Sequence, residues 1–392
     1  MLLERLNLLR SSEGHEVFTA LRDLAPTAAT EIAIATRLRK SYSAELVTAA
    51  MTMHDLRVRA RVKFAQADEL WFTREGLEQA TSESIAIYRA GRFANVPAVA
   101  DLCCGIGGDL LALANQAAQA ELLAVDRDPL HLAIAALNAD VLGVGGRITF
   151  IKADVRDAGL DGQSGIFIDP ARRSDRGRLL LGQSEPPLEW CLALDQPGRL
   201  VGIKCAPGLD HARVPGGWEF EAIALGTDLK EAVLWSPAAA RATASATVIE
   251  GDTIHRLTPA PGDPVSVRTP LPGETLLDPN PAVTRAGLVE DLARTTGAEK
   301  IDDQIGFLVA SSPIATPFAR SLYIVASLPW NEKHLRSRLR DLDAGAIDIR
   351  RRGLAGDVDA ITRRLRGKGA QPFTIAMTRV ANQPWALICT SP

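Results

Sequence analysis

The pattern of hydrophobic and polar positions changes along this chain and divides it into segments. Up to about residue 92, apolar side chains recur every three or four positions, as in "SAELVTAAMTMHDLRVRARVKF", which holds neither glycine nor proline. That spacing predicts an N-terminal region, residues 1–92, built of amphipathic α-helices. From residue 93 onward, short apolar runs alternate with helical stretches. This alternation predicts a parallel β-sheet with helices on both faces.

Five short apolar runs predict strands of that sheet. They are "AVADLC", "ELLAVD", "RITFIKAD", "GIFIDP" and "RLVGIKCAPG", with the helical stretches "DLLALANQAA" and "PLHLAIAALNADVLG" between the first three. The later segments "FEAIALGTDLKEAVLW" and "ASATVIEGD" predict a closing antiparallel pair that turns near residues 225–228. Residues 93–258 therefore predict a doubly wound, Rossmann-like α/β sheet, which binds its ligand at the carboxyl ends of the strands.

A proline-rich stretch separates this region from the rest of the chain. Residues 259–275 read "PAPGDPVSVRTPLPGET", which predicts a linker. In residues 276–392, "AVTRAGLVEDLARTTGA", "NEKHLRSRLRDL" and "DVDAITRRLRGKG" have helical spacing, and "SLYIVASL" and "QPFTIAMTRVANQPWALIC" have the character of strands. The C-terminal part therefore predicts a small α+β domain.

Composition and charge exclude several classes of protein. The net charge of the 392 residues is -3 and the aromatic fraction is 5 %, so any nucleic-acid surface must be local and a large base-stacking platform is disfavoured. The five cysteines form no C-x-x-C pair and the six histidines are scattered, which predicts no metal site and a reducing, cytoplasmic location. No apolar run reaches about 18 residues, so we expect no transmembrane helix and no membrane partner.

The stretch "VADLCCGIGGDLLALA" carries the clearest candidate chemistry. Asp101 ends a predicted strand and precedes a turn with Gly105, Gly107 and Gly108. Glycine is needed where φ is positive or where a ligand comes close to the backbone. A dinucleotide fingerprint would require glycine where Leu110 stands, and no Gly-Lys-Ser/Thr of a phosphate-binding loop follows. An acid beside such a turn suits a ligand with a cationic amino group, such as S-adenosylmethionine.

Each of the next three predicted strands also ends in an acid. Asp126 follows the glycines by about 20 residues, where a carboxylate accepts hydrogen bonds from ribose hydroxyls. Asp154 then stands where an adenine amino group would lie, and Asp169 with Pro170 stands at the lip of the expected pocket. The alternative is that these acids only cap the helices that follow them.

The motifs "DLCCGIGGDLLALA", "AVDRDPLHLAIAALNA", "ADVRD" and "FIDPARR" together resemble class I S-adenosylmethionine-dependent methyltransferases. Within them the chain looks most like the branch of trimethylguanosine synthase and related bacterial RNA methylases. "WFTREGLEQATSESIAIYRA" is similar to the element that precedes the glycine turn there, with Glu75 near the cofactor. The tail, from "LLDPNPAVTRAGLVEDLA" onward, resembles a THUMP-like domain. The resemblance implies that S-adenosylmethionine contacts Phe72, Thr73, Asp101, Cys103, Gly105, Gly107, Asp126, Arg127, Asp154, Val155 and Asp169.

The lip departs from the pattern of that branch. Its amino-group methylases carry Asp-Pro-Pro followed by an aromatic residue that stacks on the target base. Here Ala171 and Arg172 follow Asp169 and Pro170. The resemblance implies that Asp169 and Pro170 are the catalytic pair, and that Asp169 orients the methyl acceptor. Arg172 and Arg173 could bind a phosphate of the substrate, or could lie in a solvated loop.

The C-terminal part favours RNA as the substrate. Its segment 321–370 contains eleven Lys and Arg residues against six Asp and Glu residues. Within it, Arg351 and Arg352 are candidates for contacts to RNA phosphates, and the alternative is separate solvated faces. The sequence thus predicts a methyltransferase that acts on RNA, on a base nitrogen. Two other functions remain open, a small-molecule methyltransferase and a non-catalytic binding protein that kept the fold.

Overall fold

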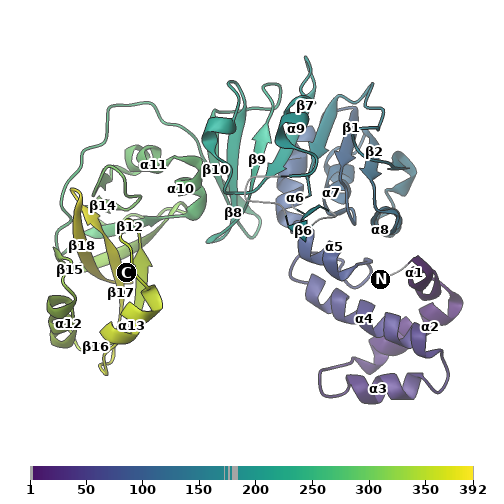
Figure 1. The fold of residues 1–392 in the computed structure, drawn as a ribbon, viewed down its shortest axis with the longest axis horizontal. Helices are drawn as coiled ribbons and strands as arrows, with labels where there is room; N and C mark the ends of the chain where they lie inside the picture. The colour runs from purple at the N-terminus through teal and green to yellow at the C-terminus, as the bar shows by residue number, and fades with distance from the viewer. Residues whose placement is uncertain (1–2, 172, 175–176, 179–183, 392) are drawn as a thin grey trace. The chain divides into compact units, whose positions relative to one another are not determined.

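The structure is a computed structural model that describes residues 3–171, 173–174, 177–178 and 184–391 (Figure 1). The chain forms two compact units. The first comprises Met1–Cys205 with Leu234–Ala239, and the second comprises Ala206–Val233 with Ala240–Pro392. Among the described residues, no helix combines the length and the apolar character needed to cross a membrane.

The N-terminal part of the first unit is helical, as predicted. Three short helices pack against the long helix α4, which buries Leu46, Ala50 and Met53 (Figure 1). The side chain of Ser43 accepts a hydrogen bond from the backbone of Leu46 and so begins α4. The elements are α1 (Leu3–Leu9), α2 (Ser12–Leu24), α3 (Glu31–Leu38), α4 (Ala44–Ala60), α5 (Arg74–Gln79), α6 (Glu83–Ala90) and the 3-10 turn η1 (Gly91–Phe93).

A parallel sheet forms the rest of the first unit, and this confirms the predicted α/β fold. Its strands lie in the order β7-β4-β1-β2-β3, and each neighbouring pair is parallel. The chain order reverses beside β1, which in such sheets is where the ligand-binding crevice lies. The elements are β1 (Ala98–Leu102), α7 (Gly108–Gln116), β2 (Glu121–Asp126), α8 (Pro129–Val141), η2 (Gly145–Arg147), β3 (Ile148–Lys152), β4 (Gly165–Ile168), β5 (Arg173–Ser174), β6 (Gly177–Arg178), α9 (Leu188–Leu192) and β7 (Leu200–Cys205).

The second unit begins with strands in the order β11-β10-β8-β9. These are β8 (Glu219–Leu225), β9 (Asp228–Trp235), β10 (Ala244–Glu250) and β11 (Thr253–Leu257), with the turn η3 (His211–Arg213) before them. A tight turn at Gly226, with φ of 56°, reverses the chain between β8 and β9 as predicted. The segment "ASATVIEGD" differs from the prediction, because β10 runs parallel to β8. Its antiparallel partner is β11.

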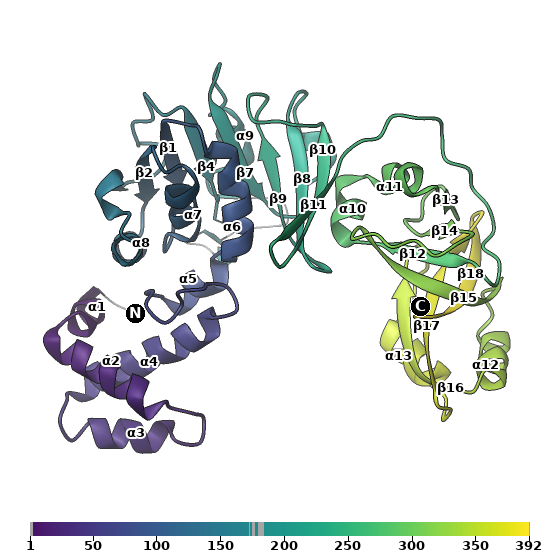
Figure 2. The same cartoon turned by 180° about the vertical axis from the view of Figure 1, so that it is seen from behind.

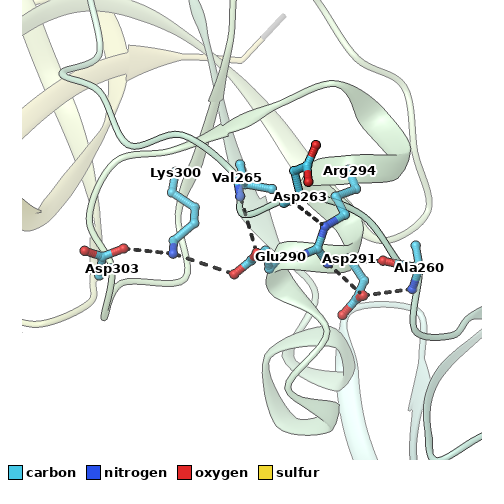
Figure 3. A network of polar contacts seen from close by, with 8 residues as sticks. All are labelled: Ala260, Asp263, Val265, Glu290, Asp291, Arg294, Lys300 and Asp303. Atoms are coloured by element: carbon cyan, nitrogen blue, oxygen red, sulfur yellow. Dashed lines mark hydrogen bonds and ion pairs between the residues drawn. The ribbon is translucent and has the colours of Figure 1, made fainter.

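The proline-rich stretch is held by side chains of a helix in the same unit. The backbone N–H of Ala260 donates to Asp291 at 2.8 Å, and Arg294 donates to the carbonyl of Asp263 at 3.1 Å (Figure 3). Glu290 accepts from the backbone of Val265 at 3.3 Å and also pairs with Lys300, which pairs with Asp303. Glu290, Asp291 and Arg294 belong to α11 (Val289–Thr296), which follows α10 (Pro281–Ala286). The sequence predicted one helix here, and Gly287, with φ of 74°, divides it into two.

The C-terminal part is a mixed sheet with two helices, which confirms the predicted α+β domain (Figure 2). Its strand order is β13-β14-β12-β15-β18-β17-β16, and α12 and α13 pack on one another and beside β16. Leu335 and Leu365 of the helices join Ile375 and Ile388 of the strands in one buried core. The elements are β12 (Thr275–Pro279), β13 (Glu299–Lys300), β14 (Leu308–Ala310), β15 (Ala319–Pro329), α12 (Glu332–Asp341), β16 (Ala344–Arg351), α13 (Val358–Leu365), β17 (Gln371–Val380) and β18 (Gln383–Thr390).

Candidate active site

The parallel register of the first unit brings the predicted acids to one edge of the sheet. Leu102 pairs with Val125 of β2 and with Ile168 of β4, and the carbonyl of Leu102 accepts the backbone N–H of Asp169 at 3.2 Å. Asp126 ends β2 opposite Lys152 of β3. Asp101, Asp126, Asp154 and Asp169 therefore all lie at or just past the carboxyl ends of neighbouring strands.

The turn after β1 requires unusual backbone conformations. Cys103, Gly105 and Gly107 have φ values of 61°, 55° and 89°. A Cβ at Gly107 would lie 3.2 Å from the Cβ of Ala135, so the turn packs tightly against α8. Burial raises the pKa of the Cys103 thiol well above its usual value, and this keeps the thiol neutral. A positive φ thus favours glycine at positions 105 and 107, and the close approach of Ala135 adds to this at Gly107. Cys103 is a poor candidate for a nucleophile.

Asp101 is a buried carboxylate that the protein itself does not satisfy. It is 1 % exposed, and within the described residues neither of its carboxylate oxygens has a hydrogen-bond partner. Burial raises its pKa well above the usual range, and the nearby charges of Asp109 and Asp169 add to this effect. A buried carboxylate without partners is costly, and a ligand ammonium group would relieve the cost. The site therefore fits a ligand that carries a cationic amino group.

Asp126 is held in place by backbone groups. Its two oxygens accept the N–H of Gly105 at 2.8 Å and the N–H of Asp128 at 2.8 Å. A carboxylate has about four lone-pair positions, so two bonds leave capacity for a pair of ribose hydroxyls. The adjacent Arg127 is exposed. Asp126, the residue predicted to bind the ribose, thus joins the glycine turn to the end of β2.

Asp154 already has a strong partner in the structure. Arg156 donates to both of its oxygens, at 2.8 and 2.6 Å, and also pairs with Glu185 at 2.8 Å. The Arg156 hydrogen bonds lower the pKa of Asp154 to about 2. Asp154 therefore stays ionised, and an adenine amino group would have to share it with Arg156. The next residue, Val155, is buried.

The element before the glycine turn packs against that turn. A Cβ at Gly76 of α5 would approach the side chain of Ile106 to 2.4 Å. Thr73 accepts the N–H of Gly76 at 2.8 Å, and its hydroxyl lies 3.2 Å from His131 of α8. Phe72 is fully buried, with its ring centroid 5.7 Å from that of Phe64, whereas Glu75 is exposed. The contact of Gly76 with Ile106 connects α5 to the site.

Asp169 is paired with a lysine that the sequence reasoning did not consider. Lys204, at the end of β7, forms an ion pair with Asp169 and donates to Thr81 at 2.9 Å. Pro170 is buried. Arg172 lies outside the described residues, and Arg173 lies in β5 with a side chain that is not described. "GIKC" ends a predicted strand in the same way as the acidic motifs do, and that position was the available signal for Lys204.

A second ion pair lies close to Asp101 and was also missed. Arg89 of α6 is almost fully buried, pairs with Asp109 of α7 and places its guanidinium 4.6 Å from the ring centroid of Phe167. Arg89 lowers, and Asp109 raises, the pKa of Asp101. Within the described residues, no group of three or more His, Cys, Asp or Glu side chains is placed to hold a metal ion.

The two candidate arginines of the C-terminal domain have different surroundings. Arg351 is exposed and donates to the carbonyl of Gly356 at 2.7 Å. Arg352 donates to Asp278 at 2.8 Å and to the carbonyl of Pro279 at 2.9 Å, and lies 5.2 Å from the ring centroid of Phe307. Arg352 thus joins β16 to β12, a use of its guanidinium that differs from the expected phosphate contact.

Three protein families match parts of this chain. Residues 96–180 match a family described as RNA cap guanine-N2 methyltransferase, and residues 319–391 match a family described as THUMP domain-like. Residues 3–60 match a family described as a domain of unknown function.

Relatives cover most of the chain. A Mycobacterium tuberculosis protein, found in strains CDC 1551 and H37Rv, is described as an uncharacterized S-adenosylmethionine-dependent methyltransferase. It is 36 % identical over 321 residues, which cover 79 % of this chain and 84 % of the relative. A crystal structure from Porphyromonas gingivalis W83, with a provisional methyltransferase assignment, has a TM-score of 0.70 at 18 % identity and covers 89 % of this chain and 91 % of that chain. That structure shares the fold.

Proposed function

The chain belongs to the S-adenosylmethionine-dependent methyltransferases, and from this premise we propose that it methylates a base nitrogen of RNA. The observation that carries the proposal is the combination of two family matches in one chain. A methyltransferase region similar to RNA cap guanine-N2 methyltransferases, residues 96–180, is followed by a THUMP-like region, residues 319–391. The excess of Lys and Arg in segment 321–370 supports a polyanionic substrate.

We assign the cofactor to the acidic edge of the first unit. Asp101 pairs with the amino group of its methionine part, because that carboxylate is buried and has no partner among the described residues. Asp126 accepts the ribose hydroxyls, and Asp154 lies on the adenine side. Cys103, Gly105 and Gly107 provide the turn around which the cofactor lies, with Phe72, Thr73, Arg127 and Val155 beside it.

The protein's part in the reaction is alignment. S-adenosylmethionine supplies a methyl group activated by its sulfonium, so that a new bond forms from the acceptor nitrogen to the methyl carbon while the carbon–sulfur bond breaks and its electron pair stays on sulfur. Asp169 accepts a hydrogen bond from the acceptor amino group and thereby directs its lone pair. The surplus proton of the methylated amine leaves to Asp169 or to water. Pro170 restricts the backbone beside that carboxylate.

The trimethylguanosine synthase-like branch is the finer part of this proposal. The match of residues 96–180 supports it, and the residues after Pro170 differ from the Asp-Pro-Pro-aromatic pattern of that branch. Because Ala171 and Arg172 replace the second proline and the aromatic residue, stacking on the target base must come from another part of the chain. From the family match we propose an exocyclic amino group of a base as the acceptor.

The decisive experiment is transfer of a tritiated methyl group from S-adenosylmethionine into total RNA from cells that lack this protein. Protein and small-molecule fractions are counted alongside, and labelled RNA is digested to nucleosides. We expect label in RNA with the wild type and with Asp161→Ala, an exposed acid away from the strand ends. Asp169→Ala should lose the label while it still binds the cofactor. Label that appears only in the small-molecule fraction would contradict the RNA proposal.

A further inference from the structure

We propose that Lys204 is a positioning residue that holds Asp169 as a charge-balanced hydrogen-bond acceptor next to the reacting methyl group. The inference rests on the proposed cofactor placement at the acidic edge, and it does not depend on the acceptor being RNA. Lys204 would act through Asp169 and would not itself touch the substrate.

The sheet register explains why these two residues meet. Ile168 of β4 pairs with Ile203 of β7, so the next residue of each strand, Asp169 and Lys204, emerge side by side at the carboxyl edge. Their side chains form an ion pair. The Lys204 ammonium also donates to Thr81, a buried residue just before α6, at 2.9 Å. The ammonium is therefore fixed from two directions, which fixes the carboxylate that it contacts.

Exposure separates the roles of the two partners. The side chain of Lys204 is 8 % exposed, whereas that of Asp169 is 31 % exposed. The ammonium thus lies behind the carboxylate, and the carboxylate is the member of the pair that an incoming group can reach. The exposed side of the carboxylate offers hydrogen-bond acceptors to the site, while Lys204 contacts it from behind. The pair therefore selects an acceptor group that presents an N–H or O–H.

Charge balance gives the pair a second effect. Asp101, Asp126 and Asp169 lie at the same edge, and the charge of Asp169 is felt at Asp101. Together, Lys204 and Asp169 add no net charge beside the sulfur of the cofactor. Without Lys204, an uncompensated carboxylate would attract the positive sulfonium of S-adenosylmethionine but not the neutral sulfur of S-adenosylhomocysteine.

The test is calorimetry of both ligands on the full chain. At an effective dielectric constant of about 20, one uncompensated charge within about 12 Å of the sulfonium changes its affinity by about tenfold or more. Lys204→Met should therefore raise the preference for S-adenosylmethionine over S-adenosylhomocysteine by at least about tenfold. Asp169→Asn should lower that preference, and the double variant, which is neutral again, should return it to within about threefold of the wild type. Lys204→Arg should keep the wild-type preference.

A matched control is the surface pair Lys230 and Asp228, 3.4 Å apart and 43 % and 74 % exposed. Lys230→Met should leave both affinities unchanged. If the role of Lys204 were merely structural, Lys204→Met would weaken the binding of both ligands equally. An unchanged ratio of the two affinities in Lys204→Met would therefore overturn the inference. If Lys204→Met does not fold, Asp169→Asn provides the test. A preference for S-adenosylmethionine over S-adenosylhomocysteine that does not fall in Asp169→Asn would also overturn the inference. Failure of the wild type to bind either ligand would instead overturn the cofactor placement.

Discussion

Asp101 and Asp126 stand at neighbouring strand ends, but the protein satisfies them differently. Asp126 accepts two backbone N–H groups, whereas Asp101 has no partner for either oxygen among the described residues. The ligand-free chain therefore tolerates Asp126 and is destabilised by an ionised Asp101. The two acids should respond differently to substitution, although both are assigned to the same cofactor.

We expect Asp101→Asn to stabilise the ligand-free protein and to weaken its binding of S-adenosylmethionine. The pKa of Asp101 is raised by burial, so the folded state binds its proton more tightly than the unfolded state does. Ionisation then costs stability as pH rises above the unfolded value of about 3.9. Denaturant unfolding of both proteins between pH 4 and pH 7.5 should show the stability advantage of Asp101→Asn growing with pH. An advantage that is constant over this range would mean that Asp101 does not titrate as its burial implies.

Asp126→Ala should weaken the binding of S-adenosylmethionine and of S-adenosylhomocysteine equally. Both ligands carry the same ribose, and the loss of a charge-assisted hydrogen bond costs about 1.5–3 kcal/mol, which is a tenfold or greater loss of affinity. Calorimetry with both ligands measures this, with Asp161→Ala as the control for removing an exposed acid. Unchanged affinity in Asp126→Ala would remove the ribose assignment.

At the scale of elements, apolar runs that end in acids were enough to predict the strands and the edge where the acids meet. Periodicity reports what one segment does, and a parallel register then brings the strand ends together without further information. Pairings between distant segments were not predictable in this way. Lys204 and Asp169 are 35 positions apart, and Arg352 and Asp278 are 74 apart. Which of many charged residues pair depends on how the strands line up, which the sequence pattern does not contain.

The proline-rich stretch is the element whose structure adds most to its sequence. Its prolines lack the N–H groups needed for regular structure, and backbone groups of Ala260, Asp263 and Val265 are bonded instead to side chains of α11. Arg294 has a central place, because it donates to the carbonyls of Ala260 and Asp263 and also pairs with Glu290. Residues 260–265, the part of the stretch that is bonded to α11, are called the strap below.

Arg294→Met should loosen this strap without affecting the cofactor. Loss of its hydrogen bonds should speed amide exchange in residues 260–265 and cost about 1–3 kcal/mol of unfolding free energy. Hydrogen–deuterium exchange with peptide resolution measures the first effect, and S-adenosylmethionine affinity should stay within twofold. Arg320→Met, which removes a more exposed pairing with Asp348 at 3.8 Å, is the matched control. Equal exchange in both variants would show that the strap does not depend on Arg294.

At the scale of the whole molecule, the second unit limits how the role of the C-terminal domain can be tested. Helix α10 packs on β8 and β10 within that unit, so a truncation near Glu274 would expose their apolar side chains. Arg352 is unsuitable for charge reversal, because that change would also break its contacts with Asp278. Exposed arginines that form no ion pair within the described residues are the better probes. They include Arg336 of α12, Arg351 of β16 and Arg363 of α13.

Charge reversal of these exposed arginines should weaken RNA binding and leave cofactor binding intact. If the wild type contacts three to five phosphates, the logarithm of its RNA affinity should fall with the logarithm of salt concentration at a slope of roughly -2 to -4. Each of Arg351→Glu and Arg363→Glu should reduce the magnitude of that slope by about 1 if its arginine meets a phosphate. Arg10→Glu, an exposed arginine of the N-terminal helical region, should leave the slope unchanged. Fluorescence anisotropy with a labelled RNA across a salt series measures these slopes. A slope that falls equally in Arg10→Glu would show that the RNA responds to the net charge of the protein and not to a surface of the C-terminal domain.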